Sequence, residues 1–277
     1  MPKKKTRVDA ATAFGLLLAA LGIVGGLILE GGQLSDITQV TAALIVFGGT
    51  IGAVMVTTPV STLVRAAKQV KWVFLTEPSA VPSVIDELIG YANKARKQGL
   101  VSLEAEVDQI TDPFLRKALS LAVDGTDLQD LRRMMELELV MEERQAEAAA
   151  KVYEAAGGYA PTIGIIGAVL GLIQVMKQLA NIEAVGHGIA VAFVATVYGV
   201  GIANLFFLPA GAKLKARMHE TSLVREVMLE GVISIVEGMN PKLIRTKLEA
   251  FLEDRGHAPA QQPSGAAPMT QTASVRS

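Results

Sequence analysis

The sequence predicts an all-α membrane protein with four transmembrane helices and a large helical cytoplasmic domain between the second and the third. Hydrophobic residues make up 51% of the 277 residues, and they are concentrated in four apolar runs. Each run is about 20 residues long, which an α-helix needs to cross a hydrocarbon core of about 30 Å. The long stretch between the second and third runs is charged and has helical periodicity.

The first two apolar runs lie in the N-terminal part. Residues 1–9 carry a basic head and are assigned to a cytoplasmic N-terminus. Residues 10–29 form predicted transmembrane helix 1. This run is longer than the core of a secretory signal and no small-residue cleavage motif follows it, so we expect it to be retained. Residues 37–60 form predicted transmembrane helix 2, in which Gly48 and Gly52 offer a face for close helix packing.

Residues 61–156 form a predicted cytoplasmic helical domain. Within it, Asp112 followed by Pro113 is typical of a helix start. Thr126 and Gln129 fit a capping box, which predicts the start of a long helix that runs on toward the third membrane segment. Such a helix could transmit motion between the cytoplasm and the membrane.

Residues 157–179 and 188–210 form predicted transmembrane helices 3 and 4, joined by a short polar link from Asn181 to His187. Small residues recur every four positions in both helices, at Ala160, Gly164 and Ala168 and at Ala195, Gly199 and Ala203. Apolar burial does not drive helix association in lipid, so such small-residue faces favour close backbone packing. The pair is therefore predicted to pack against other helices.

Pro161 and Pro209 bracket this hairpin, and the sequence leaves two interpretations of them open. In the first, Pro161 is a first-turn proline and Pro209 is a helix breaker near the membrane surface. In the second, both prolines are hinges where the membrane helices meet the inner domain.

The remaining segments and the basic residues give the expected topology. Residues 211–255 are predicted cytoplasmic C-terminal helices, and residues 256–277 are rich in Pro, Ala, Ser and Gln, which predicts a disordered tail. Lys177 is the only lysine or arginine of the outer links. The positive-inside rule therefore places both termini in the cytoplasm, on the side of Lys3, Lys4, Lys5, Arg7, Arg65, Lys68, Lys71, Lys213, Lys215 and Arg217.

The central parts of the four runs, residues 10–29, 37–60, 160–176 and 188–208, contain no Asp, Glu, Lys, Arg or His. A protein that moved protons by itself would be expected to carry an ionisable group there, since such groups mark ion pathways in membranes. The polar groups that remain are chiefly hydroxyls, including that of Thr196.

Several other functions have no support in the sequence. There is no cysteine, and the three histidines lie far apart, so no metal site is expected. The net charge is −1 and no basic stripe with interleaved aromatic residues occurs, so no nucleic acid partner is expected. No nucleophile, phosphate-loop or dinucleotide motif occurs either, so we expect neither an enzyme nor a cofactor.

Four segments together carry a resemblance to a known family: ARKQGLVSLE, GGYAPTIGIIGAVLGLI, VAFVATVYGVGIANLFFLPAGAKLK and NPKLIRTKLEAFL. With the order of the spans, they make the chain resemble the flagellar motor stator A subunit family (MotA/PomA type) over residues 8–252. The resemblance implies an ion-driven torque unit of the bacterial inner (plasma) membrane, embedded in membrane lipid. It also implies a ring of A subunits, a pentamer, around B-type stator subunits whose single transmembrane helix carries the ion-accepting aspartate.

The resemblance also implies roles for single residues. Arg96, Lys97 and Glu104 match the charges that engage the switch-ring protein of the rotor, and Pro161 and Pro209 match the prolines that couple ion passage to movement. Thr196 matches a threonine that lines the ion site. Ala168 stands where sodium-driven members tend to have a threonine, so we expect protons as the coupling ion, because one oxygen ligand for a cation is missing.

Two alternatives remain. The related energising subunits of outer-membrane transport (ExbB/TolQ type) have three spans with the large loop after the first, whereas this chain has four predicted spans with the loop after the second. A stand-alone ion channel or transporter is disfavoured by the lack of ionisable residues in the spans.

Overall fold

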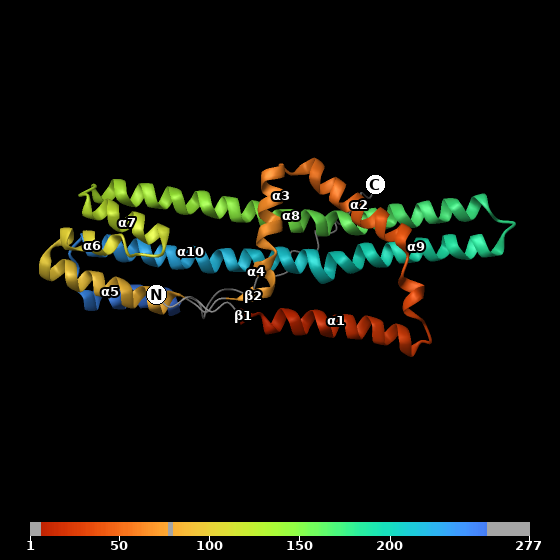
Figure 1. Cartoon of the computed structure of the whole chain (residues 1–277), viewed down its shortest axis with the longest axis horizontal. Coiled ribbons are helices and arrows are strands. Elements are labelled where there is room, and N and C mark those ends of the chain that lie inside the picture. The colour runs from red at the N-terminus through yellow and green to blue at the C-terminus, as the bar shows by residue number, and fades with distance from the viewer. Residues whose placement is uncertain (1–6, 77–79, 254–277) are drawn as a thin grey trace, which may run out of the picture.

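The computed structural model describes residues 7–76 and 80–253 (Figure 1). The predicted disordered tail, residues 256–277, and most of the predicted N-terminal segment lie outside the described residues. The first part of the chain contains β1 (Arg7–Val8), α1 (Ala10–Leu29), the 3₁₀ helix η1 (Leu34–Ile37), α2 (Val40–Thr57), α3 (Val60–Gln69), α4 (Lys71–Phe74) and β2 (Leu75–Thr76). The second part contains α5 (Val81–Gln98), the 3₁₀ helix η2 (Leu100–Leu103), α6 (Glu104–Val107) and α7 (Pro113–Val123). The last part contains α8 (Leu128–Lys177), α9 (Ile182–Ile202), the π-helix η3 (Ala203–Phe207), α10 (Leu208–Val236) and α11 (Pro241–Glu253).

The predicted fold class is confirmed. Four helical segments are long and apolar enough to cross a membrane, namely Ala10–Leu29, Leu34–Thr57, Leu128–Lys177 and Ile182–Val236. The β1–β2 pair, two residues on each side, is the only sheet among the described residues. The molecule is therefore an α-helical membrane protein with a helical region between its second and third membrane segments.

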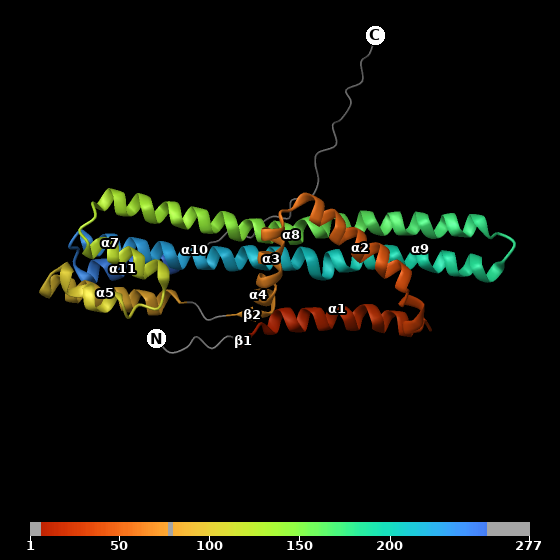
Figure 2. The same cartoon turned by 45° about the horizontal axis from the view of Figure 1, so that its top comes forward.

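Two very long helices form the axis of the molecule. The 50-residue α8 runs one way, and α9, η3 and α10 run back beside it as one continuous helical segment (Figures 1 and 2). At the end opposite the α8–α9 link, α5, α6, α7 and α11 gather around α8 and α10. Their shared core is apolar and includes Leu88, Phe114, Leu119, Met135, Ile233 and Ile244.

Two local features differ from the sequence prediction. The helix α8 is capped by Asp127, whose side chain accepts a hydrogen bond from the Gln129 backbone N–H at 2.8 Å, so the predicted capping box with Thr126 at the cap is wrong. The carboxylate is a strong N-cap acceptor, and it wins over the neighbouring hydroxyl. The helix α9 begins at Ile182 and is capped by Asn181. The predicted link from Asn181 to His187 is therefore wrong, because its residues after Asn181 belong to α9.

Close backbone contact joins α8 and α9, as the small-residue spacing predicts. A Cβ atom added at Gly164 would lie 2.9 Å from the Ala195 carbonyl oxygen, and one added at Gly199 would lie 2.5 Å from the Ala160 carbonyl oxygen. Real Cβ atoms do not approach backbone this closely, so these positions require glycine. The membrane hairpin is thus held by backbone-to-backbone packing.

The helix α2 packs on this pair through a different glycine from the two expected. Gly48 and Gly52 have nothing within 4 Å of an added Cβ, counting the described residues only, so the predicted face makes no close contact within the described chain. Gly49 makes the contact instead, because an added Cβ there would lie 2.7 Å from Ile163 Cγ2. Helical spacing alone marks a close-packing face, and the fold decides which neighbouring glycine faces the partner helix.

The helix α1 stands apart from the other membrane helices, with no buried residue along its length (Figure 1). It is held at its N-terminal end. The Asp9 backbone N–H donates to the Phe74 carbonyl at 2.8 Å, and β1 pairs with β2. Since almost all of its surface faces outward, the placement of α1 depends on the contacts of its first residues.

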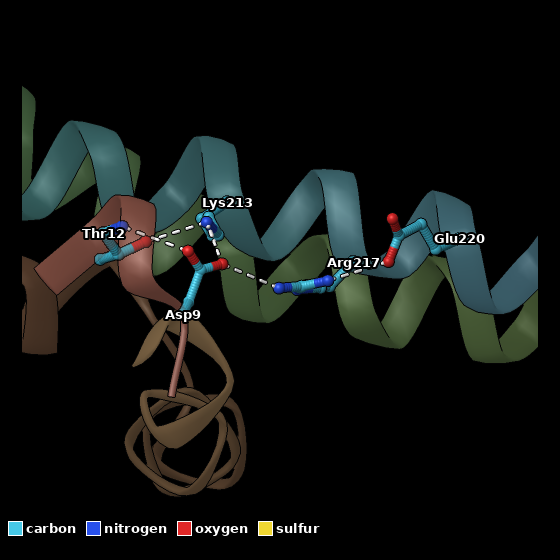
Figure 3. A network of polar contacts seen from close by, with 5 residues as sticks. All are labelled: Asp9, Thr12, Lys213, Arg217 and Glu220. Atoms are coloured by element: carbon cyan, nitrogen blue, oxygen red, sulfur yellow. Dashed lines mark hydrogen bonds and ion pairs between the residues drawn. The ribbon is translucent and has the colours of Figure 1, made fainter. Parts of the chain in front are cut away.

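Asp9 is the centre of these contacts (Figure 3). Its carboxylate caps α1 by accepting from the Thr12 backbone N–H at 3.2 Å, and it pairs with Lys213 Nζ at 2.5 Å and with an Arg217 nitrogen at 3.0 Å, both on α10. Lys213 also donates to the Thr12 hydroxyl, and Arg217 extends the network to the exposed Glu220. The hydrogen bond from Lys213, the Thr12 amide and the two positive charges hold the pKa of the Asp9 carboxyl below its usual range. The network ties the first membrane helix to the segment that follows the fourth.

We predict that Gly199→Ala destabilises the hairpin and that Gly201→Ala does not. The first methyl group would collide with the α8 backbone, whereas an alanine Cβ at Gly201 meets nothing within 4 Å. Overpacking of this kind costs about 1–3 kcal/mol. Thermal unfolding of the two variants in the same detergent checks this, and equal melting temperatures would contradict the packing described above.

We predict that Asp9→Asn lowers the melting temperature at neutral pH while the α1 N-cap is retained, because asparagine also caps helices. The Asp9 pKa is lowered in the folded state, so its stabilisation is present above the usual carboxyl pKa of about 3.9 and is lost as the pH falls through the folded value. The difference between the wild type and the variant should therefore shrink on acidification. Glu220→Gln is the control, since Glu220 is exposed and contacts only the outer side of Arg217; a constant difference at every pH would refute the assignment.

Candidate functional site

Pro161 lies in the interior of α8, and the helix continues through it. The interpretation of Pro161 as a first-turn proline is therefore wrong. A proline inside a helix lacks the N–H that would bond the carbonyl four residues earlier, and its ring crowds that carbonyl. The residue four positions earlier is Gly157, which has no side chain to add to the crowding.

Pro209 occupies the second position of α10, and Leu208 separates it from the π-helical turn η3. The chain stays helical from Ile182 to Val236, so the interpretation of Pro209 as a helix breaker is also wrong. A π turn carries one extra residue, which shifts the hydrogen-bond register just where the proline cannot donate. The two long helices thus accommodate their prolines by different local means.

The two proline regions touch each other. A Cβ atom added at Gly157 would lie 2.5 Å from the Leu208 side chain, which places the residue before Pro209 directly over the glycine four positions before Pro161. Beside this contact, the Phe206 ring lies 6.4 Å from the Tyr153 ring in an edge-on arrangement. We call the position of this contact along the long axis the proline level; Pro161 lies four residues from it toward the α8–α9 link, and Pro209 lies one residue from it in the opposite direction.

A small apolar cluster packs immediately on the cytoplasmic side of this level. It brings α3 and α4 across the two long helices, and the Tyr153 hydroxyl donates a buried hydrogen bond to the Ala66 carbonyl at 2.9 Å. Its buried members are Ala66, Val73, Ala149, Ala150, Tyr153, Ala210 and Leu214. We call this set the junction cluster. It fixes both long helices close to their prolines.

The predicted ion-path residues lie at the α8–α9 contact. Thr196 is half-buried on α9, and its hydroxyl donates to the Ala192 carbonyl at 3.2 Å. Ala168 is half-buried on α8 and follows Gly167, at which an added Cβ would meet Ala195 at 2.8 Å. The structure thus brings Thr196 and Ala168 onto the facing helices of the hairpin.

The predicted rotor-contact residues lie at the opposite end of the molecule. Arg96 and Lys97 are in the last turn of α5, and Glu104 begins α6. All three are exposed, and none forms an ion pair with another residue in the described ranges. The two helices are joined by the Lys94–Glu106 salt bridge at 2.7 Å, and Gly99 makes the turn at φ 85°. This arrangement presents three unpaired charges at the tip farthest from the α8–α9 link (Figures 1 and 2).

The described residues contain no cluster of three or more His, Cys, Asp or Glu side chains that could hold a metal ion.

Two structural features were not found from the sequence, namely the contacts of Asp9 and the contact between Gly157 and Leu208. Asp9 was a detectable helix-cap signal, since an aspartate directly before an apolar run is a frequent N-cap. The pairing of Gly157 with Leu208 had no local signal, because it depends on how α8 and α10 meet.

Comparison with known proteins agrees with this geometry. Residues 106–227 match the MotA/TolQ/ExbB proton channel family, and residues 13–99 match the motility protein A N-terminal family. The chain is 35% identical to motility protein A of Bacillus subtilis over 246 residues, covering 88% of this chain and 91% of that protein. It is 37% identical to motility protein A of Helicobacter pylori over 245 residues, covering 88% and 95%.

A solved structure described as the flagellar MotAB stator complex from Bacillus subtilis contains a similar chain. The two have a TM-score of 0.82 at 34% identity, covering 90% of this chain and 99% of the other. The resemblance seen in the sequence is confirmed, and the rival ExbB/TolQ-type and stand-alone channel interpretations are not favoured. The chain belongs to the motility protein A (MotA/PomA) family and is a multi-pass membrane subunit of the flagellar stator.

Proposed function

We infer that this chain acts with a B-type stator subunit and uses an ion-motive force to turn the flagellar rotor. The observation that carries the proposal is the contrast between the two ends of the molecule. The apolar stretches 10–29, 37–60, 160–176 and 188–208 contain no Asp, Glu, Lys, Arg or His, whereas the cytoplasmic tip presents Arg96, Lys97 and Glu104 unpaired among the described residues. An ion path through such spans needs a carboxylate from outside the chain.

In the proposed unit, several copies of this chain, a pentamer, surround the B subunits. The single membrane helix of each B subunit supplies the aspartate that accepts the ion. This aspartate would face Thr196 and the α8–α9 contact. Protonation removes a charge that is costly in the bilayer, which changes how the partner helix packs against α8 and α9 and lets the ring step. The similar Bacillus subtilis chain belongs to a MotAB stator complex, which supports a partner of this type.

The proline regions and the long helices provide the route for the mechanical step. Pro161 and Pro209 flank the proline level, the junction cluster holds both helices beside them, and α8 continues unbroken to the tip domain. A small tilt at the proline level therefore displaces Arg96 and Glu104 at the far end. These charges push the switch-ring protein of the rotor by electrostatic contact.

The proposed location is the bacterial inner membrane with both termini in the cytoplasm. The basic residues near α1, α3, α4 and α10 support this orientation through the positive-inside rule. The tip charges then face the cytoplasm, where the base of the rotor is accessible.

We predict that Arg96→Glu and Glu104→Lys each reduce swimming speed and torque strongly at normal membrane abundance. Reversing one charge turns an attractive contact into a like-charge contact, which costs several kcal/mol at an interface. Arg144→Glu is the matched control, because Arg144 is an exposed arginine of α8 that lies beside Ser61 and Thr62 of α3 and not at the tip. Torque measured on tethered cells distinguishes the variants, and unchanged torque in the Arg96 and Glu104 variants would exclude the proposed rotor contact.

We predict that protons are the coupling ion, because Ala168 offers no hydroxyl to a dehydrated cation. Cells that depend on this stator should keep swimming when external sodium is removed at fixed pH, and they should stop when a protonophore is added. The reverse pattern would show that sodium drives the unit.

A further inference from the structure

The segment α3–α4 has a different orientation from the other helices of the long axis. It runs across α8 and α10 instead of along them (Figures 1 and 2). It connects the cytoplasmic ends of two membrane helices, because Pro59 at the end of α2 caps α3, and the Phe74 carbonyl at the end of α4 accepts the Asp9 N–H at the start of α1. A helix that links two span ends at right angles to the spans lies at the membrane surface.

The helix α3 is amphipathic, as a helix at a membrane surface must be: it has an apolar flank and a polar flank. Ala66 is buried against the bundle, within the junction cluster. By helical spacing, one flank of α3 is apolar and consists of Val60, Leu63, Val64 and Ala67. Val60 is 70% exposed and Val64 is 48% exposed, so these apolar side chains have no protein cover within the described chain.

The opposite flank is polar and basic. Arg65 shows which way this flank points, because its guanidinium bonds the Gln145 side chain on the cytoplasmic half of α8. Lys68 follows on the same side of the helix and is exposed. Lys71 lies over the Trp72 ring, with its Nζ 5.2 Å from the ring centroid. Tryptophan and lysine are typical of the membrane–water boundary.

The charge state of this segment also differs from that of its neighbours. Three lysines of the neighbouring helices are neutralised within the chain: Lys151 pairs with Glu147, Lys213 with Asp9, and Lys215 with Glu154. In contrast, Arg65, Lys68 and Lys71 form no ion pair with any carboxylate of the described residues. Their positive charge is thus left for an external partner at the membrane surface.

We propose that α3–α4 is a binding surface for anionic phospholipid of the cytoplasmic leaflet. Val60 and Val64 enter the boundary between headgroups and acyl chains, and the lipid phosphates are held by Lys68, Lys71 and Arg65. An amphipathic helix with a basic polar flank binds anionic membranes in this way, through buried apolar area and electrostatic attraction. Because the junction cluster joins this segment to Tyr153 and Ala210, bound lipid steadies the long helices just below the proline level. The proposal requires only that the chain spans a membrane, and it does not depend on the coupling ion or on the rotor.

The chain carries its own probe for this proposal, since Trp72 is its only tryptophan and lies on α4. The full chain is placed in nanodiscs that contain brominated phosphatidylglycerol diluted in phosphatidylcholine, or brominated phosphatidylcholine at the same bromine content. Bromine quenches tryptophan fluorescence only at short range. We expect stronger quenching by the brominated phosphatidylglycerol, and we expect this preference to weaken at high salt because charge attraction is screened.

The test variant is Lys68→Gln with Lys71→Gln, with Arg65 kept because it also bonds Gln145. Each lysine near an anionic surface is worth roughly fivefold in lipid enrichment, so the double variant should lose most of the phosphatidylglycerol preference. The control is Arg133→Gln with Lys242→Gln, which removes the same charge from exposed positions of α8 and α11 and should leave the preference unchanged. Comparing two lipids within one variant cancels any direct effect of Lys71 on the Trp72 emission.

Three results would overturn the proposal. Equal quenching by the two lipids in the wild-type chain would show that the surface does not select anionic lipid. An unchanged preference in the Lys68 and Lys71 variant would assign the selection to other residues. Absence of quenching by either lipid would show that protein, for instance a second copy of this chain, covers α3–α4.

Discussion

The backbone contact between α8 and α9 is the constraint on which the rest of the structure depends. In a bilayer, two helices gain little from hiding apolar side chains from each other, because lipid is equally apolar. Association then requires that the backbones come close, and only glycine permits this at Gly164, Gly171, Gly188 and Gly199. The α2 helix packs on the surface that this pair creates.

Both long helices contain a proline near the Gly157–Leu208 contact, and both remain continuous. In α8 the residue four positions before the proline is Gly157, whereas in the returning segment a π turn precedes Pro209. The 50 residues of α8 give a helix of about 75 Å at 1.5 Å per residue. A helix of this length transmits a tilt from one end to the other only if it is unbroken. A proline inside a continuous helix supplies a point of lower bending resistance without interrupting the lever. This combination supports the proposed coupling of the membrane hairpin to the distant tip.

The sequence predicts the elements of this fold better than their connections. Hydropathy is enough to find the four spans, since length and apolar composition are set by the bilayer. The Asp112–Pro113 helix start also holds, because its hydrogen bonds are local. The wrong predictions concern features that neighbouring segments decide: Gly49 and not Gly48 contacts α8, and Pro161 lies within α8 and not in its first turn. The exposed position of Arg96 and Glu104 at the tip depends on how α5 and α6 fold against the core, which no local pattern encodes.

The hydrogen bond of Thr196 bears on what the ion path can do. In the sequence, such a threonine has an ordinary interpretation, in which its hydroxyl bonds its own helix, and the structure shows this bond to the Ala192 carbonyl. The bond uses the hydroxyl proton, so the oxygen lone pairs are directed away from the α9 backbone. An oxygen oriented in this way can accept a hydrogen bond from a protonated carboxyl group. It cannot readily donate to the charged carboxylate without losing its backbone partner. In the proposed unit, Thr196 therefore favours the protonated form of the partner's aspartate, which is the form that must cross the apolar part of the interface.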